Sequence, residues 1–129
     1  MLRPLLFSLL MILPAAAPAE VIRPVSEKSS FQIALEGERP VLVLFQGKNC
    51  AACRAVEQWI DQLSGELDGK VDIVSLDIDE NPYTKEAFGV EGTPTLLMFK
   101  DGEQVGGMVG ATAREDLRAF IAKSAHIPL

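Results

Sequence analysis

An apolar segment that runs into two cysteines at the start of a helical pattern constrains the fold more than any other feature. Residues 41–45 form a continuous apolar run, which is typical of a strand buried on both faces of a sheet. Cys50 and Cys53 follow as C-x-x-C and are the only two cysteines in the 129 residues. Apolar residues then recur at helical spacing as far as Leu67. The sequence therefore predicts a strand, a short turn and a helix that begins at the cysteine pair.

The position of the cysteine pair at the start of a helix predicts redox chemistry. Unpaired N–H groups and the positive end of the helix dipole stabilise a thiolate at that point. The thiolate is also the form that attacks a disulfide. The second sulfur lies on the same helix face, close enough to close a small disulfide ring. We therefore predict a catalytic pair with Cys50 as nucleophile and Cys53 as resolving thiol.

Three other interpretations of the cysteines explain less of the sequence. A structural zinc site needs about four nitrogen or sulfur ligands, and besides the cysteines the chain has a single histidine, His126. A purely structural disulfide across two intervening residues removes little loop entropy and would stabilise the fold little. Two buried, unpaired thiols fit poorly with the polar neighbours Lys48, Asn49 and Arg54. We therefore expect no bound metal.

The first 19 residues have the pattern of a secretory signal peptide. Arg3 precedes an almost wholly apolar stretch from Pro4 to Ala17, which is shorter than the roughly 20 residues of a membrane span and ends in small residues. We predict cleavage before Glu20 and a single domain over residues 20–129. The short signal suits a bacterial periplasmic protein; an uncleaved anchor and a eukaryotic secreted protein are the alternatives. In such an oxidising compartment a dithiol pair is expected to be redox-active or bridged.

The charge balance argues against nucleic acid as a partner. The chain has 18 acidic and 12 basic residues and a formal net charge of −6. A nucleic-acid-binding domain normally carries a basic surface. Scattered acidic residues on a small exported domain are usually only a solvated surface, so they indicate no particular ligand.

The rest of the chain alternates between strand and helix patterns in the order β-α-β-α-β-α-β-β-α. Strands are predicted near residues 21–24, 41–45, 71–78, 95–99 and 104–109, and helices after Ser29, over about 50–67, after Asn81 and after Thr112. The alternation predicts a parallel part with right-handed crossovers, and the hairpin signal at Asp101-Gly102 adds an antiparallel edge. Helices are expected on both faces of this α/β sheet.

Three helix starts carry capping signals in the sequence. Ser29–Gln32 and Thr112–Glu115 have the spacing of a capping box. Asn81 followed by Pro82 is typical of an N-cap with proline in the first helical position.

From about Ser26 to its end, the chain resembles thioredoxin. The resemblance is carried by the segments Phe45–Arg54, Leu76–Pro82 and Phe88–Gly102, together with Gly110. It implies the thioredoxin fold, in which a central mixed sheet has a parallel βαβ part and an antiparallel hairpin edge, with helices on both faces.

The resemblance also implies a substrate groove beside the cysteines. The Thr93–Pro94 bond is expected to be cis and to face the cysteine pair, since cis bonds are nearly confined to X-Pro. Thr93, Pro94 and Gly110 are then expected to contact an extended substrate peptide by short β-augmentation. Asn49, Ala51 and Ala52 would surround the reacting sulfurs.

This chain departs from the family pattern at several positions near the cysteines. The substitutions are Gln46 and Asn49 for two tryptophans, Ala51-Ala52 for Gly-Pro, Leu44 for a buried aspartate, Ser75 for its lysine partner, and Gln58 for a helix proline. In the family the buried carboxylate and lysine assist proton transfer at the resolving thiol, which Leu44 cannot do. Cys53 must then lose its proton to water or substrate. The missing negative charge favours the Cys50 thiolate, so we expect a reduction potential different from that of thioredoxin.

We expect a thiol–disulfide oxidoreductase of thioredoxin type that acts on protein disulfides or thiols in the periplasm. A mixed disulfide at Cys50 would be resolved by Cys53, and no cofactor is needed because the thiols carry the electrons. The sequence does not fix the direction of electron flow. We favour a reductase, which in an oxidising compartment requires a membrane electron donor. The domain is expected to be a monomer with protein substrates as partners.

Two other functions stay open. A thioredoxin-fold chaperone or adaptor could use the groove without turnover, which would agree with the loss of the buried carboxylate, its lysine and both tryptophans. A dedicated reductase could keep the cysteines of one client reduced, for example in cytochrome c maturation.

Overall fold

The computed structural model describes Pro4, residues 10–13 and residues 21–129. Most of the predicted signal segment, residues 1–19, lies outside the described residues, so its cleavage before Glu20 stays a prediction. Within the described ranges, none of the helices is both long enough and apolar enough to cross a membrane.

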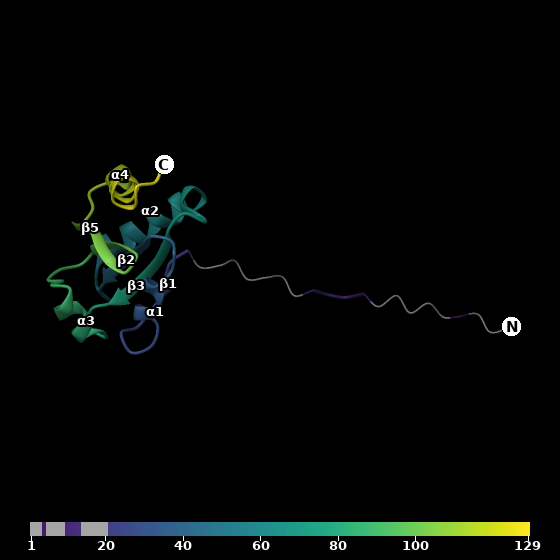
Figure 1. The fold of residues 1–129 in the computed structure, drawn as a ribbon, viewed down its shortest axis with the longest axis horizontal. Helices are drawn as coiled ribbons and strands as arrows, with labels where there is room; N and C mark the ends of the chain where they lie inside the picture. Colours follow the sequence, from purple (N-terminus) through teal and green to yellow (C-terminus); the bar gives the residue numbers. More distant parts are fainter. Residues whose placement is uncertain (1–3, 5–9, 14–20) are drawn as a thin grey trace.

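The elements follow one another in the predicted order (Figure 1). The strands are β1 (Arg23–Pro24), β2 (Val41–Gln46), β3 (Asp72–Asp77), β4 (Thr95–Lys100) and β5 (Glu103–Val109). The helices are α1 (Phe31–Leu35), α2 (Ala51–Leu67), α3 (Pro82–Ala87) and α4 (Arg114–Ala125).

The five strands form one mixed sheet in the order β1-β3-β2-β4-β5. β1, β3 and β2 are parallel, and their crossovers run through α1 and α2. β4 lies antiparallel to β2, and β5 adds an antiparallel edge with a register shift between Met98 and Phe99. The predicted combination of a parallel βαβ part and an antiparallel hairpin edge is therefore confirmed.

β2 lies at the centre of the sheet and contributes to the apolar core on both faces. Its side chains alternate: Val41, Val43 and Phe45 join a cluster with α1, whereas Leu42 and Leu44 join a cluster with α2 and α4. All five are at most 1% exposed. Figure 1 shows the same layers, with α2 and α4 on one side of the sheet and α1 and α3 on the other. A strand with both faces covered explains the uninterrupted apolar run in the sequence.

Both predicted capping boxes are wrong. α1 begins one residue later than its box requires, and the hydroxyl of its N-cap residue Ser30 instead accepts from the Ser26 N–H at 3.1 Å. α4 has Ala113 at the N-cap position, and the Thr112 hydroxyl pairs with the Asp116 carboxylate. In each case the polar side chain has another partner within reach, which the local spacing rule does not consider.

Asn81 occupies the predicted N-cap position of α3 but makes no side-chain cap bond. Its Oδ1 accepts from the Glu27 N–H at 2.9 Å, and its Nδ2 donates to the Asp77 carbonyl at 2.8 Å. The side chain is 4% exposed. It therefore connects three segments of the chain that meet beside the end of β3.

Candidate active site

The predicted strand–turn–helix is present, and the first cysteine is the residue that caps the helix. β2 ends at Gln46, and α2 begins at Ala51 with Cys50 in the extended N-cap conformation. The Cys50 Sγ accepts a hydrogen bond from the Cys53 N–H at 3.1 Å. The sulfur thus takes the place of the serine or aspartate oxygen that usually caps a helix. The same N–H would stabilise a Cys50 thiolate, because a hydrogen bond to a charged acceptor is stronger than one to a neutral acceptor. The helix start therefore favours the ionised form of Cys50.

Cys50 and Cys53 form a disulfide, and the two sulfurs differ in access. Their Cα atoms are 5.2 Å apart. Cys50 is half-buried, whereas Cys53 is 0% exposed. An external disulfide can therefore reach only Cys50, which agrees with the predicted division into an attacking sulfur and a resolving sulfur.

The cis-proline segment lies at the same edge of the sheet as the cysteine loop. The Thr93–Pro94 bond is cis, as the resemblance implied. The Gly110 N–H donates to the Pro94 carbonyl at 2.7 Å, so these two residues are direct neighbours. A Cβ added to Gly47, in the loop before Cys50, would lie 3.4 Å from the Thr93 Oγ1. The predicted substrate residues thus lie side by side, next to the loop that leads to Cys50.

An arginine and a glutamate that the sequence analysis did not single out hold this loop against α2. Arg54 donates from Nη2 to the Gly47 carbonyl at 3.1 Å and from Nη1 to the Glu57 Oε2 at 3.2 Å. The spacing of three residues on a helix was the available signal for the ion pair. The contact to Gly47 depends on the turn and was not visible in the sequence.

Lys48 lies in the same loop and pairs with Glu80 beyond β3. The Nζ to Oε1 distance is 3.3 Å, and both side chains are about two-thirds exposed at 69% and 65%. The hydrogen bond and charge of Glu80 raise the pKa of Lys48 above its ordinary value. Exposed pairs of this kind contribute little to stability, which supports the interpretation of Lys48 as a solvated loop charge.

The layer beneath the active-site helix carries no ionisable group at the two positions where the family has its charge pair. Leu44 is 0% exposed and belongs to the apolar cluster under α2. Ser75 is 4% exposed and is the register partner of Leu44 on β3. Within the described residues, no group of three or more His, Cys, Asp or Glu side chains is placed to hold a metal ion.

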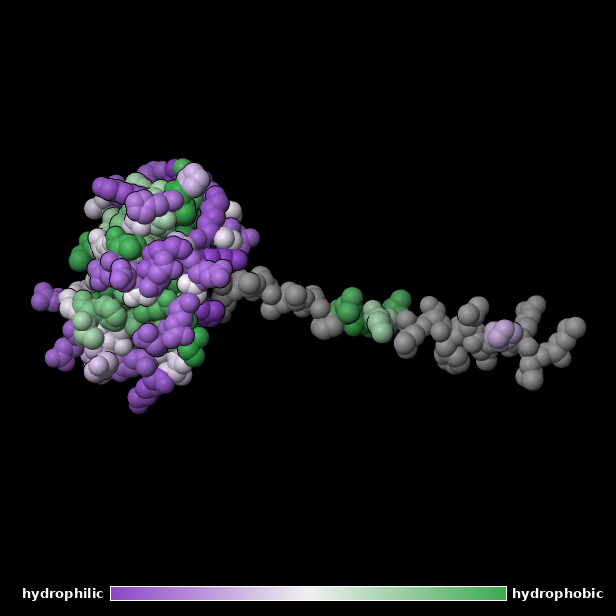
Figure 2. Space-filling view, in the orientation of Figure 1, coloured by the Kyte–Doolittle hydropathy of each residue, from purple (hydrophilic) through white to green (hydrophobic). Residues whose placement is uncertain are grey.

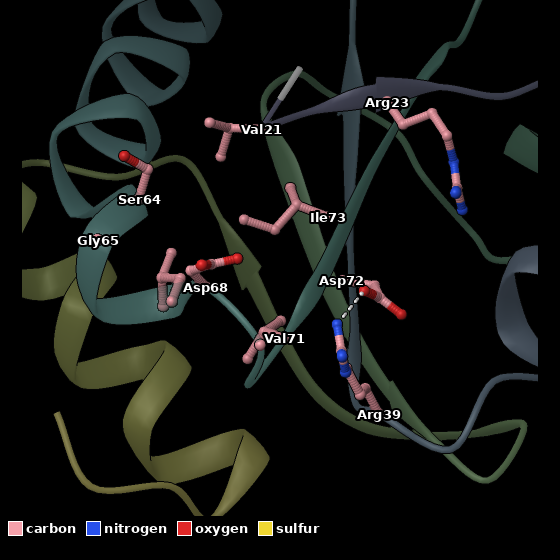
Figure 3. Close-up of a pocket in the computed structure, with 11 residues that line it drawn as sticks. Val21, Arg23, Arg39, Ser64, Gly65, Asp68, Val71, Asp72 and Ile73 are labelled. Atoms are coloured by element: carbon pink, nitrogen blue, oxygen red, sulfur yellow. Dashed lines mark ion pairs between the residues drawn. The ribbon is translucent and has the colours of Figure 1, made fainter. Parts of the chain in front are cut away.

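A hollow of about 450 Å³ lies at the other end of α2 (Figure 3). It is lined by the last turn of α2, including Ser64 and Asp68, and by Val21 and the start of β3. The Arg39–Asp72 ion pair, at 3.5 Å, closes one side of it. Because α2 is 17 residues long and each residue adds ~1.5 Å, this hollow is too far from the cysteines to take part in their chemistry.

The fold and the site together define a class of proteins that exchange thiols and disulfides. A cysteine pair at a helix N-terminus, with one accessible sulfur and a cis proline alongside, is suited in its reduced form to attack another disulfide through the accessible thiolate. The family model for thioredoxin matches residues 22–123. This chain therefore belongs to the thioredoxin family, and its site is that of a thioredoxin-type protein-disulfide oxidoreductase.

Comparisons with individual proteins agree with this assignment. The chain is 39% identical to a thioredoxin of Synechocystis sp. over 99 residues, which cover 77% of this chain and 92% of that protein. It is 45% identical to thioredoxin C-2 of Corynebacterium nephridii over 87 residues, or 67% of this chain and 81% of that protein. A solved structure of a mutant thioredoxin from Halobacterium salinarum NRC-1 superposes with a TM-score of 0.74 at 26% identity, covering 88% of this chain and 99% of that chain.

Proposed function

We propose that this chain is an exported reductase of protein disulfides that works in the bacterial periplasm. The observation that carries the proposal is the unequal access of the two bonded sulfurs, with Cys50 half-buried and Cys53 fully buried. With this arrangement the accessible sulfur of Cys50 can react with the substrate, and the buried sulfur of Cys53 can then attack the mixed disulfide. In an oxidising compartment the pair must be returned to the dithiol form, and a membrane electron donor would supply those electrons.

The reaction follows from the positions of the two sulfurs. The Cys50 thiolate attacks one sulfur of the substrate disulfide, and the first substrate thiolate leaves with the electron pair and takes up a proton. The mixed disulfide is then attacked at Cys50 Sγ by the Cys53 thiolate. The second substrate thiolate leaves, and the Cys50–Cys53 disulfide remains. Two electrons have moved from the protein to its substrate.

The substrate segment would lie along the cis-proline side of the site. An extended peptide can pair with the backbone of Thr93, and the space beside Gly110 is open, with no atom within 4 Å of an added Cβ. Val109, next to it at the end of β5, is 80% exposed and offers an apolar contact. Asn49, Ala51 and Ala52 would border the attacking sulfur.

The periplasmic location is supported by the N-terminal pattern and by the apolar residues that precede the domain. The side chains of Leu10 to Leu13 are between 79% and 83% exposed, and they form a separate apolar patch in Figure 2. A run of this kind suits recognition by an export machinery. Expression of the full chain in a bacterium should give a periplasmic protein whose first residue is Glu20. A product that keeps residues 1–19 in a membrane pellet would instead identify an anchor.

Trapping experiments test the exchange reaction itself. Cys53→Ser should accumulate covalent mixed disulfides with client proteins, because the second step is blocked. Cys50→Ser should accumulate none and should lose all turnover in an insulin reduction assay. Full activity of Cys50→Ser would refute the proposed reaction.

A binding module without turnover is the second candidate, and the uncharged layer beneath α2 favours it. Leu44 and Ser75 cannot exchange a proton with the buried Cys53 as a carboxylate and lysine could. The same trap separates the two functions. A pure binder should capture clients with both cysteines intact or replaced and should form no mixed disulfide in Cys53→Ser.

A further inference from the structure

A hollow with both polar and apolar lining lies directly beside the active-site helix, on the side that faces β1 and β3. Its volume is about 480 Å³, and its polar lining comes from Gln46 and Ser75 on the sheet and from Glu57, Gln58 and Asp61 on α2. A second hollow of about 420 Å³ shares Gln46 and Ser75 and extends past the end of β3. These spaces therefore reach the layer of the sheet on which α2 packs.

Gln46 places an unpartnered hydrogen-bond acceptor at this hollow. Its Oε1 is buried and has no hydrogen-bond partner among the residues that the structure describes. Buried polar atoms are nearly always satisfied, by ordered water where protein groups are absent. The hollow beside Gln46 has polar groups in its lining and is large enough for several water molecules. Water can therefore stand next to α2 close to the first turns of the helix.

Cys53 needs a proton acceptor that the sheet does not provide. Its side chain is 0% exposed, and it must become a thiolate before it can attack the mixed disulfide. Leu44 and Ser75, at the two positions where the family has its charge pair, cannot take up this proton at neutral pH. The proton must therefore pass to water, to the substrate or to a side chain on another element.

Glu57 is in the right place to be that acceptor. It lies four residues after Cys53 on α2, so the two side chains are neighbours on one helix face. Glu57 lines the hollow, and its side chain is only 28% exposed. The ion pair with Arg54 fixes its carboxylate, because Arg54 is itself held by the Gly47 carbonyl.

The other charged groups around the hollows are less suitable. Asp61 lies one turn further from Cys53 and is exposed. The Asp77 Oδ1 accepts from the Asp79 and Glu80 N–H groups at 2.8 and 3.1 Å. Lys28 and Glu80 line only the second hollow, which does not include Glu57.

We propose that Glu57, through water in the hollow, accepts the proton that Cys53 loses when it resolves the mixed disulfide. The Sγ–H bond of Cys53 breaks, and the proton passes by water to the Glu57 carboxylate. A Cys53–Cys50 bond forms while the bond between Cys50 and substrate breaks, and the substrate thiolate leaves with the electron pair. Glu57 then returns its proton to solvent. The proposal rests on the proposed function, since it concerns the second step of that reaction.

A two-phase kinetic experiment tests this role. The reduced protein is mixed with one equivalent of dithiobis(nitrobenzoate), a disulfide whose released thiolate is coloured. The first phase reports attack by Cys50, and the second phase reports resolution by Cys53. Glu57→Gln should slow the second phase about tenfold at pH 7, which is below the usual range of general-base effects because solvent provides a slower parallel route. The first phase should change less than twofold.

Two further variants serve as controls for Glu57→Gln. Asp61→Asn removes the same charge from the same helix and the same hollow, one turn further away, and should leave both phases within twofold. Glu57→Asp should recover the second phase to within about threefold. In Glu57→Gln the second-phase rate should rise nearly tenfold per pH unit, as when solvent alone takes the proton, whereas the unmodified protein should show a shallower dependence.

The possible failures are distinguishable. Equal second phases in Glu57→Gln and the unmodified protein, with an intact first phase, would overturn the proton path and leave the proposed function standing. Equal slowing by Asp61→Asn would overturn it as well, because the effect would then be general electrostatics. Absence of the first phase in the unmodified protein would remove the proposed function and the proton path together.

Discussion

Placing a carboxylate beneath the active-site helix, at the position where the family resemblance implies one, should destabilise this chain in a pH-dependent way. Leu44→Asp places a carboxyl at a position that is 0% exposed and lies in the apolar cluster with Val56 and Ile60 of α2. Its register partner is the neutral Ser75. Ser75 therefore cannot supply a counter-charge to the new carboxylate.

The magnitude can be worked out in two steps. Removing the buried leucine side chain costs about 1.5–3 kcal/mol, and burying a neutral carboxyl with an incomplete set of partners costs about 1–3 kcal/mol. With a neutral carboxyl, Leu44→Asp should therefore lower the free energy of unfolding by roughly 3–6 kcal/mol in total. Leu44→Asn should lower it by the same amount. Desolvation should raise the pKa of the new aspartate by about 3 units above its unfolded value near 3.9. Because of this shift, the free energy of unfolding of Leu44→Asp falls by about 4 kcal/mol more at pH 7.

The sign of the pH effect follows from the direction of that shift. Below pH ~3.9 the aspartate is protonated in both states, so the charge has no cost there. As the pH rises toward the folded pKa, only the unfolded state loses its proton, and the free energy of unfolding falls. Leu44→Asp should therefore equal Leu44→Asn near pH 4 and be far less stable at pH 7.

Urea unfolding of both oxidised variants, followed by circular dichroism at pH 4 and pH 7, measures this difference. Equal free energies of unfolding for the two variants at both pH values would refute the reasoning. That result would mean that water from the hollow beside Gln46 and Ser75 already hydrates position 44. Adding Ser75→Lys to Leu44→Asp should recover most of the loss at pH 7, because the lysine supplies the missing counter-charge.

Two more predictions concern stability away from the cysteines. A Cβ at Gly106 would lie 2.6 Å from the Ser124 Cβ, so Gly106→Ala should cost about 1–3 kcal/mol by overpacking; Gly65→Ala, in open space on α2, should instead stabilise by about 0.5–1 kcal/mol. The same sign for both in thermal unfolding would contradict the structure. The Arg118 hydrogen bond lowers the pKa of Glu66 from its ordinary 4.5, so this pair stabilises the fold above that pH and loses its effect as the pH falls through the lowered pKa. Arg118→Met should lower the unfolding midpoint at pH 7 and not near pH 2; an equal loss at both would argue against a charge effect.

The order of the elements could be predicted from the sequence because hydrophobic burial dominates it. The run at residues 41–45 is apolar throughout since β2 has α1 on one face and α2 on the other. The stripe from Val56 to Leu67 is amphipathic since α2 covers only one side of the sheet. These patterns reflect which face of each element is buried, and burial is set by the fold as a whole.

The helix caps could not be predicted because they depend on partners far away in the sequence. The Asn81 side chain does not cap α3 and instead accepts a hydrogen bond from the backbone N–H of Glu27, which is 54 residues earlier. Glu27 in turn accepts from the Thr84 N–H at 2.8 Å with its own carboxylate, so it does for α3 what Asn81 was expected to do. A spacing rule along the chain cannot find such an exchange.

The candidate site likewise contains residues that could be predicted from the sequence and residues that could not. Cys50, Cys53 and the cis Pro94 were predicted because motif and resemblance place them in fixed positions. Glu57 and the hollow could not be predicted, because the hollow is lined by residues from separate parts of the chain, on β1, β2, β3 and α2. The substitution of Gln46 for a tryptophan was visible in the sequence, but the buried, unpartnered oxygen that follows from it was not.

The separation of Glu57 from Cys50 leads to a last prediction about the two sulfurs. The Cys50 sulfur is held by the Cys53 N–H at the helix start, and no negative charge lies on the sheet beneath it at position 44. Glu57 lies on the far side of Cys53 along α2, and its charge is already balanced by Arg54. Glu57→Gln should therefore leave the pH at which Cys50 reacts with iodoacetamide unchanged, while slowing resolution by Cys53. A parallel shift in Cys50 alkylation would show that one field acts on both sulfurs, and that the helix start alone does not control the nucleophile.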